Sequence, residues 1–356
     1  MIIFGNTSYT KEQIKSGVAT DLLSEYARGF EFCRDWLNGA QRFFMQTSGS
    51  TGRPKQIEVN RSQLISSVRA TGRFFEVTEG WKLLCCLDVE KIAGKMMLIR
   101  AMEWEGEALV QLPTANPLKN VVEDAFDFVA MVPLQVEACL SEPGSSAVLN
   151  QVRNLIVGGA PLSASLRKKM QQLKGNVYQT YGMTETVSHI ALANVKNPGP
   201  LIYQALPEVE LRIDAGNKLA VKAPMTGNQW VQTQDVVDLI SPYSFCWKGR
   251  ADFIVNSGGV KIHPEEVSEA VSGLVQDCFP GRRYFVSGLP DNKLGQILVL
   301  VVEGNPIPER EKTFLEHARA LLPRFSNPKR ILFVSEFKMT QSGKIDQLQT
   351  LASWKN

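Results

Sequence analysis

The sequence predicts an α/β protein with two domains. The large N-terminal domain is expected to hold helix-covered mixed β-sheets and a small barrel-like β subdomain, and the small C-terminal domain to be α+β. Three observations favour this fold: strands and helices alternate over the first half, short strands cluster after residue 200, and a separate helix–strand pattern follows residue 253. Such alternation is typical of a helix-covered parallel sheet. We expect the large domain to span 1–251 and the small domain 252–356.

The first elements flank a loop rich in glycine and serine. Residues 11–38 carry apolar side chains at helical spacing and are expected to be helical. Residues 41–47 and 56–60 are expected to be strands on either side of the loop 48–54. A helix is predicted for 61–75, where apolar residues share one face.

The remaining strands and helices are predicted from the same sequence patterns. The middle predicts further strands at 81–87, 108–112, 128–132, 154–158 and 176–182, with helices at 95–104 and 163–173. The small β subdomain is expected from short strands at 209–213, 218–222, 230–234 and 236–240. In the C-terminal domain, helices are expected at 263–275 and 309–322, the first opening with Pro264.

Composition restricts the class of protein. Hydrophobic residues make up 44% and charged residues 21% of the 356 residues, as in ordinary globular proteins. A net charge of +3, with scattered basic residues, argues against nucleic acid as a partner. The six cysteines form no C-x-x-C pair, and neither a signal peptide nor a membrane-spanning stretch is recognisable. We therefore expect a cytoplasmic protein that acts on a small molecule, and a homodimer is left open.

The segment Thr47–Lys55 has the composition of an anion-binding loop. Seven of the eight residues from Thr47 to Pro54 are Gly, Ser, Thr or Pro, and Lys55 adds a positive charge. Glycines allow close backbone approach, and consecutive N–H groups bind anions. The spacing differs from that of a P-loop, and a strand is predicted after it where a P-loop has a helix. A polyphosphate is the ligand that this pattern favours, and a flexible hairpin turn is the alternative.

The segment TSGSTGRPK resembles the phosphate-binding signature of the adenylate-forming superfamily, which includes acyl-CoA synthetases, adenylation domains and luciferases. Four further segments resemble that family's motifs in the family's order: LIVGGAPLS, YQTYGMTET, GRADFIVNSGGVKIHPEEVS and MTQSGKID. The tripeptide TQD stands where the family has T-G-D. The resemblance runs from about residue 41 to 346.

The resemblance implies an ATP-dependent acid–CoA ligase that uses Mg²⁺ and coenzyme A. It implies that the phosphates of ATP are bound by Thr47, Ser48, Gly49, Ser50, Thr51, Gly52 and Lys55. It implies that Gly159, Ala160, Pro161, Tyr181 and Gly182 border the adenine. It also implies that Thr184 contacts the α-phosphate, that Glu185 binds Mg²⁺, that Asp235 accepts from both ribose hydroxyls, and that Arg250 approaches the ribose and phosphate.

The resemblance also implies a mobile C-terminal domain. Lys344 is expected to reach the α-phosphate during adenylation. Asp252 matches the family's hinge position, although a surface carboxylate that caps a turn is the alternative. After rotation, Gly258 and Gly259 are expected to line the channel for the pantetheine arm of coenzyme A.

The sequence departs from the family pattern in four places. Only 46 residues precede the loop, so much of the usual N-terminal region is missing. Lys91 stands where the family has histidine, Gln234 replaces the glycine of T-G-D, and Phe253 replaces the second hinge acid. The acyl pocket is therefore expected to be more open.

The segment TETVSHIALA is similar to that of o-succinylbenzoate–CoA ligases of menaquinone biosynthesis. Their substrate has a second carboxylate, which needs a cation, and the candidates are Lys91, Lys95 and Arg100. Each is equally compatible with a solvated helix face. His189 is a further substrate candidate, or else a core histidine. The alternatives for function are another aryl or fatty acid–CoA ligase, a stand-alone adenylation enzyme, and a non-catalytic nucleotide-binding relative.

The predicted role of Lys344 is directly testable. Lys344→Ala should lower the rate of acyl-AMP formation by on the order of 10²–10³ and leave ATP affinity nearly unchanged, because the lysine acts where charge develops. Conversion of supplied acyl-AMP and coenzyme A to thioester should continue at a near-normal rate. Single-turnover assays of the two half-reactions measure this. Normal acyl-AMP formation would show that Lys344 is only a solvated side chain.

Overall fold

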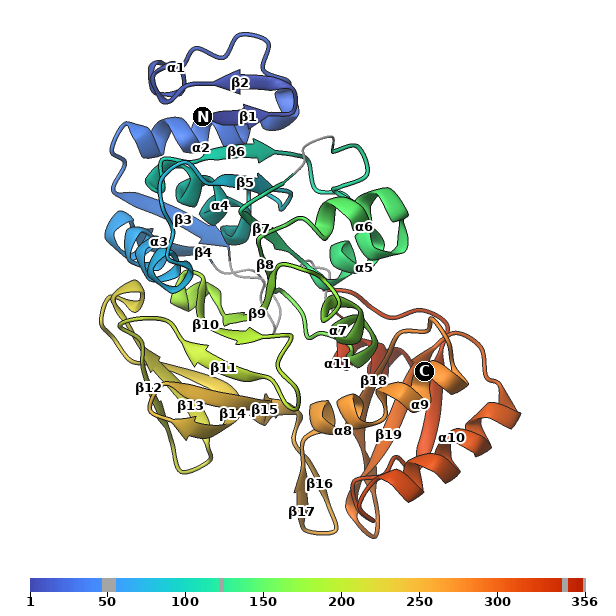
Figure 1. Cartoon of the computed structure of the whole chain (residues 1–356). Coiled ribbons are helices and arrows are strands. Elements are labelled where there is room, and N and C mark those ends of the chain that lie inside the picture. Colours follow the sequence, from blue (N-terminus) through green and yellow to red (C-terminus); the bar gives the residue numbers. More distant parts are fainter. Residues whose placement is uncertain (47–55, 122–124, 341–344, 355–356) are drawn as a thin grey trace.

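The computed structural model describes residues 1–46, 56–121, 125–340 and 345–354 (Figure 1). Within these residues, two β-sheets of different size dominate the architecture, and a separate two-stranded hairpin accompanies them. The larger sheet has thirteen described strands and the smaller has five.

The centre of the large sheet is parallel, as the alternation of strands and helices predicted. Neighbouring parallel strands are, in sheet order, β9 (Asn176–Gly182), β8 (Asn154–Val157), β7 (Phe128–Met131), β5 (Lys82–Cys85), β6 (Glu107–Val110) and β1 (Ile2–Phe4). The edge strand β2 (Thr7–Tyr9) pairs antiparallel with β1. The short N-terminal segment thus extends the sheet beyond β6.

Both faces of this parallel half are covered by apolar helices. In β7, Phe128 and Ala130 join one hydrophobic cluster, whereas Val129 and Met131 join another. Successive side chains of a strand point to opposite faces, so a strand buried on both sides must be apolar throughout. The first cluster is built with α2 (Ala27–Leu37), α3 (Arg61–Phe75) and α4 (Ile92–Glu103), and the second with α5 (Pro133–Ser141), α6 (Pro143–Leu149) and α7 (Ala164–Met170).

The small β subdomain expected after residue 200 is present as an antiparallel extension of the same sheet (Figure 1). Its order beyond β9 is β10 (His189–Asn194), β11 (Ile202–Ala205), β15 (Ser244–Arg250), β14 (Val231–Ser241), β13 (Lys218–Lys222) and β12 (Glu210–Ile213). The two strands predicted at 230–234 and 236–240 are wrong as separate elements. They form the single strand β14, whose register against β15 shifts between Val236 and Val237.

The single helix predicted for 11–38 is also wrong. The chain forms α1 (Lys11–Ser16), a 3-10 turn η1 (Ser24–Tyr26) and then α2. Gly17 ends α1 with a φ of 77°, a left-handed conformation that glycine adopts without steric cost. The strands predicted around the glycine-rich loop are confirmed as the hairpin of β3 (Arg42–Gln46) and β4 (Gln56–Asn60).

The C-terminal part has its own sheet and hydrophobic cores. Its strands are β16 (Val255–Ser257), β17 (Val260–Ile262), β18 (Tyr284–Asp291), β19 (Gly295–Glu303) and β20 (Arg330–Val334). Its helices are α8 (Pro264–Ala270), α9 (Ser272–Cys278), α10 (Pro308–Leu321) and α11 (Gln347–Trp354), so the helix predicted at 263–275 is divided. The domain boundary at residue 252 stays a prediction. None of the described helices is long and apolar enough to cross a membrane.

The start of α4 depends on a glycine. A Cβ atom at Gly94 would lie 2.3 Å from the Asp88 carbonyl oxygen, which belongs to the turn after β5. Gly94→Ala should therefore lower the stability of the large domain by about 1–3 kcal/mol, because the turn and helix must separate. Gly144→Ala in α6 is the matched control, since nothing lies within 4 Å of its added Cβ. Urea unfolding midpoints measure both, and equal midpoints would contradict the close packing.

Candidate active site

Several of the expected nucleotide-binding residues lie together at the carboxyl ends of β8 and β9. Gly159, Ala160 and Pro161 follow β8, and Tyr181 and Gly182 end β9. The next segment, η2 (Thr184–Thr186), carries Thr184 and Glu185. Ligands of open α/β sheets bind outside the carboxyl ends of parallel strands, and β8 and β9 are such neighbours.

Asp235 connects this edge to the antiparallel strands. The Tyr181 hydroxyl donates to Asp235 Oδ2 at 2.7 Å, and the indole Nε1 of Trp247 donates to Asp235 Oδ1 at 3.0 Å. Burial, together with the Asp235 charge, holds the pKa of Tyr181 well above its usual value. Arg250 is the β15 partner of Asp235 in the ladder. Trp247 was not predicted as a site residue, because it lies just before the segment GRADFIVNSGGVKIHPEEVS and belongs to none of the recognised motifs.

The chain turns sharply between the expected phosphate motif and the substrate segment. Val187, a buried residue, has a φ of 68°, and Ser188 N donates to Thr186 O at 2.7 Å. This i→i+2 bond defines a γ-turn, a strained conformation for a β-branched residue. The turn sends Ser188 across Gly182, where an added Cβ would lie 2.3 Å from the Ser188 carbonyl oxygen. Gly182 is therefore required by the packing of the chain itself.

The three candidate cations have very different surroundings. Lys91 is exposed at the N-cap of α4. Lys95 is half-buried, with Nζ 3.4 Å from the Phe44 carbonyl oxygen. Arg100 is 2% exposed, and burial lowers its pKa to about 9, so the guanidinium stays charged near neutral pH.

Arg100 has no carboxylate partner among the described residues. Its guanidinium donates to Ser188 Oγ at 3.3 Å and to the Met97 sulfur at 3.7 Å, and it lies 5.6 Å from the Phe128 ring centre. Its Nε is buried without any acceptor in the described part of the chain. A buried charge is ordinarily paired. This side chain therefore has the properties of a receptor for an anion.

His189 is buried beside Arg100. Its Nε2 lies 3.2 Å from Thr71 Oγ1 and its Nδ1 lies 3.4 Å from Ser188 Oγ. Burial, and secondarily the charge of Arg100, holds the pKa of His189 well below its usual value. The imidazole is therefore neutral at physiological pH.

The segment that joins the two sheets carries the expected hinge. Asp252 lies in η4 (Ala251–Phe253) and accepts from Arg250 at 2.6 Å. The helix α8 packs against β15, where the half-buried Glu265 accepts from the backbone N–H of Arg250 at 3.3 Å. Lys248 links Asp238, at 3.1 Å, to Glu266 of α8, at 2.7 Å. The two sheets thus meet beside the ladder that holds Asp235.

The structure does not bring Gly258 and Gly259 to this place. They form the turn of the β16–β17 hairpin, with φ of 59° and 82°, and the hairpin projects away from the ends of β8 and β9 (Figure 1). The expected phosphate-binding residues Thr47, Ser48, Gly49, Ser50, Thr51, Gly52 and Lys55 lie outside the described residues. So does Lys344, whose neighbours Met339 and Ile345 pair in an isolated bridge.

The described residues fit a nucleotide with its metal ion. The Glu185 side chain is exposed at the strand ends and has no hydrogen bond or ion pair within the described chain, so its oxygens can bind a hard cation. No group of three metal-binding side chains occurs in the described residues. A magnesium ion would therefore depend on the phosphates as well as on Glu185, as is usual for this ion.

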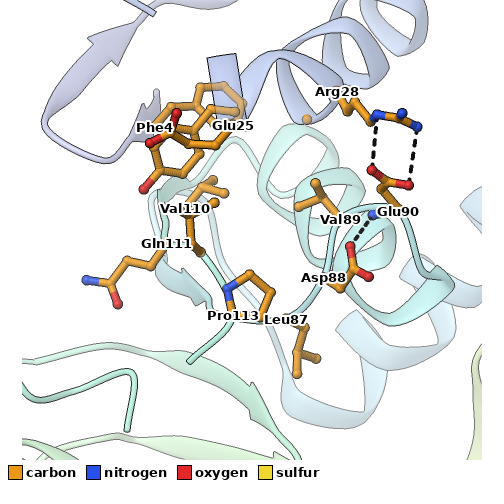
Figure 2. A pocket seen from close by; sticks show the side chains of 13 residues that line it. Phe4, Glu25, Arg28, Leu87, Asp88, Val89, Glu90, Val110, Gln111 and Pro113 are labelled. Carbon is orange, nitrogen blue, oxygen red and sulfur yellow. Dashed lines mark hydrogen bonds and ion pairs between the residues drawn. The ribbon is translucent and has the colours of Figure 1, made fainter. Parts of the chain in front are cut away.

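A small cavity lies elsewhere along the same edge, between the N-terminal segment and the loop after β5 (Figure 2). Its volume is about 70 Å³, far below that of a nucleotide site. Three charged groups at its rim have partners, since Arg28 donates to Glu90 and Asp88 accepts from the Glu90 backbone N–H. We assign it to the packing of the short N-terminal segment.

Comparison with known families matches both parts of the chain. Residues 38–238 match the model of the AMP-binding enzymes, and residues 265–344 match the AMP-binding enzyme C-terminal domain. The chain belongs to the AMP-binding enzyme family. This confirms the family indicated by the sequence motifs and the expected adenylate-forming fold, and the enzyme is an acyl-CoA synthetase.

Individual relatives fall into short and long forms. A solved acyl-CoA synthetase (AMP-forming)/AMP-acid ligase II-like protein from Dyadobacter fermentans is 38% identical, with a TM-score of 0.66, and the match covers 97% of this chain and 99% of that one. The two chains therefore match over nearly their whole lengths.

Two longer relatives carry more specific names. A 2-succinylbenzoate–CoA ligase from Lactococcus lactis is 25% identical over 85% of this chain and 68% of its own length. The structure of O-succinylbenzoate coenzyme A synthetase from Bacillus subtilis, in complex with ATP and magnesium ion, is 20% identical, with a TM-score of 0.73, over 86% of this chain and 69% of that one. The latter comparison shows a shared fold.

The contact between α8 and β15 can be tested at Gly249. An added Cβ there would lie 2.3 Å from Glu265 Oε2, and its φ is 144°. Gly249→Ala should lower the melting temperature through both the clash and the backbone strain. In a Glu265→Ala background the loss should be smaller, because the clash is absent. Calorimetry of the four variants measures this coupling. Equal losses in both backgrounds would contradict the contact.

Proposed function

We propose that this enzyme converts 2-succinylbenzoate, ATP and coenzyme A into the 2-succinylbenzoyl thioester, AMP and pyrophosphate, as in menaquinone biosynthesis. In the first step a substrate carboxylate oxygen attacks the α-phosphorus, and pyrophosphate leaves. In the second step the sulfur of coenzyme A attacks the acyl carbon, its proton is lost, and AMP leaves. The second substrate carboxylate takes no part in either bond change.

The observation that carries the proposal is the buried guanidinium of Arg100, which has no carboxylate partner among the described residues. A long-chain fatty acid would leave this cation unpaired in an apolar site, at a large free-energy cost. A dicarboxylate supplies the missing anion. The names of the Lactococcus and Bacillus relatives support the same substrate.

Arg100 is preferred over the two lysines for a physical reason. An exposed lysine such as Lys91 contributes little to binding, because water and salt screen its charge. Lys95 is half-buried and already faces the Phe44 carbonyl. A buried guanidinium with an open Nε–H offers a charge-assisted hydrogen bond in a poorly screened environment.

The residues at the strand ends are assigned to ATP and its metal ion in this proposal. Asp235 holds the ribose, Tyr181 faces the adenine, Thr184 contacts the α-phosphate, and Glu185 binds Mg²⁺, which would neutralise phosphate charge. Asp235 already accepts from Tyr181 and Trp247, and each carboxylate oxygen has a further lone pair for a ribose hydroxyl. The rotation that brings Gly258 and Gly259 to the thioester site is part of the same proposal.

A panel of acids separates the alternatives. Pyrophosphate release is measured with 2-succinylbenzoate, with 4-oxo-4-phenylbutanoate and 2-butanoylbenzoate, which each lack one of its two carboxylates, and with octanoate. The proposal predicts the highest kcat/KM for the dicarboxylate, and the active monoacid identifies the reacting carboxylate. A preference for octanoate would indicate a fatty acid ligase. Release with every acid but no thioester would indicate a stand-alone adenylation enzyme, and no release would indicate a non-catalytic relative.

The proposed role of Arg100 is tested most directly by a substitution that removes its charge. Arg100→Met should raise the KM for 2-succinylbenzoate roughly 10- to 150-fold, since a hydrogen bond between charged groups contributes about 1.5–3 kcal/mol. The KM for the reacting monoacid should change little. Lys91→Met is the matched control and should leave both KM values unchanged. Normal use of the dicarboxylate by the Arg100 variant would place its cation elsewhere.

A further inference from the structure

Arg100 and His189 belong to one chain of hydrogen bonds that runs from the guanidinium to the backbone of α3. The links are Arg100 to Ser188 Oγ at 3.3 Å, Ser188 Oγ to His189 Nδ1 at 3.4 Å, His189 Nε2 to Thr71 Oγ1 at 3.2 Å, and Thr71 Oγ1 to the Ser67 carbonyl at 2.9 Å. Thr71, His189 and Arg100 are buried.

The direction of every link is fixed by the two ends. A carbonyl only accepts, so the Thr71 hydroxyl proton is given to Ser67 O, and Thr71 Oγ1 must accept from His189 Nε2–H. A guanidinium only donates, so Ser188 Oγ accepts from Arg100 and has its own proton free for His189 Nδ1. The Thr71 end therefore requires a proton on His189 Nε2, and at the other end the Ser188 hydroxyl proton finds an acceptor in the chain only when Nδ1 is unprotonated. The chain of hydrogen bonds is thus complete when His189 is neutral with the proton on Nε2.

This state agrees with the electrostatics of the site. Burial and the neighbouring guanidinium both lower the pKa of His189. Both imidazole nitrogens are engaged within the chain, so neither is left for a substrate. The sequence-based hypothesis that His189 contacts the substrate directly therefore gives way to an indirect role.

We propose that His189 is a positioning residue for Arg100. Its Nδ1 lone pair holds the Ser188 hydroxyl as an acceptor for one guanidinium nitrogen, which fixes the guanidinium plane and leaves Nε–H directed at the second substrate carboxylate. The strained γ-turn at Val187 supports this role, because it places Ser188 and His189 beside α3 and α4. The proposal rests on the proposed role of Arg100 in binding that carboxylate.

The test is the selectivity for the second carboxylate, measured as the Kd of the reacting monoacid divided by that of 2-succinylbenzoate. Titration calorimetry with a non-reactive ATP analogue gives both constants without turnover. His189→Ala removes the acceptor for Ser188 and should reduce the ratio about five- to tenfold. His189→Asn keeps an acceptor at the Nδ1 position and should restore the ratio to within about twofold of the wild type.

Two controls separate this proposal from a general loss of packing and from failure of the proposed function. Leu192→Ala, also buried in β10, should lower stability but leave the ratio unchanged. Arg100→Met should bring the ratio close to one. If Arg100→Met leaves the ratio unchanged, the proposed function is at fault. If Arg100→Met acts as expected but His189→Ala matches Leu192→Ala, the positioning role is overturned.

Nitrogen NMR of histidine-labelled protein tests the protonation state independently of any substrate. The chain has three histidines, so the resonances are readily assigned by substitution. His189 should appear as the neutral Nε2–H tautomer and should stay neutral around physiological pH, because burial lowers its pKa. A proton on Nδ1, or a charged imidazole at neutral pH, would remove the acceptor for the Ser188 hydroxyl and refute the proposal.

Discussion

A cation buried without an anion, within the part of the chain that the structure describes, is the constraint on which the proposed acyl site depends. Removing a guanidinium from water costs several kcal/mol even after relaxation, and a paired carboxylate would ordinarily offset that cost. Here Arg100 has only a serine hydroxyl, a thioether sulfur and an aromatic ring among the described residues. Weak neutral partners keep the charge available, so the strongest partner that the site can acquire is an anionic ligand.

The sheet explains how this cation comes to lie close to the segment that follows the expected nucleotide-binding residues. The helix α4 follows β5 and carries Arg100, while Ser188 lies between η2 and β10, immediately after the segment expected to bind phosphate and metal. The turn at Val187 thus joins the expected nucleotide-binding segment to Ser188, the hydrogen-bond partner of Arg100. On the opposite side of the expected nucleotide-binding residues, Asp235 is hydrogen-bonded to Tyr181 and Trp247. It lies beside the segment that leads into the C-terminal sheet.

Much of this arrangement could be predicted from the sequence, and the failures have physical causes. The buried parallel strands were predicted because double-sided burial requires continuous apolar runs such as Phe128–Met131. The break in the first helix was missed because Gly17 was read as an interior residue, whereas its left-handed backbone ends α1. Strand β14 was predicted as two short strands, because the sequence does not show that one strand continues through the shift in register against β15. Spacing identified Arg100 as a cation near the pocket, but only tertiary packing distinguishes it from Lys91 and Lys95. Trp247 could not be predicted from the sequence, because its hydrogen bond to Asp235 depends on the pairing of β14 with β15.

A structure of the enzyme with a non-hydrolysable 2-succinylbenzoyl adenylate tests the central claim most directly. The account predicts that the free carboxylate lies within hydrogen-bonding distance, about 2.7–2.9 Å, of Arg100 Nε or a terminal guanidinium nitrogen. The Ser188 and His189 contacts should be retained in that complex. A free carboxylate bound by Lys95 or by solvent, with the Arg100 guanidinium still unpaired, would contradict it.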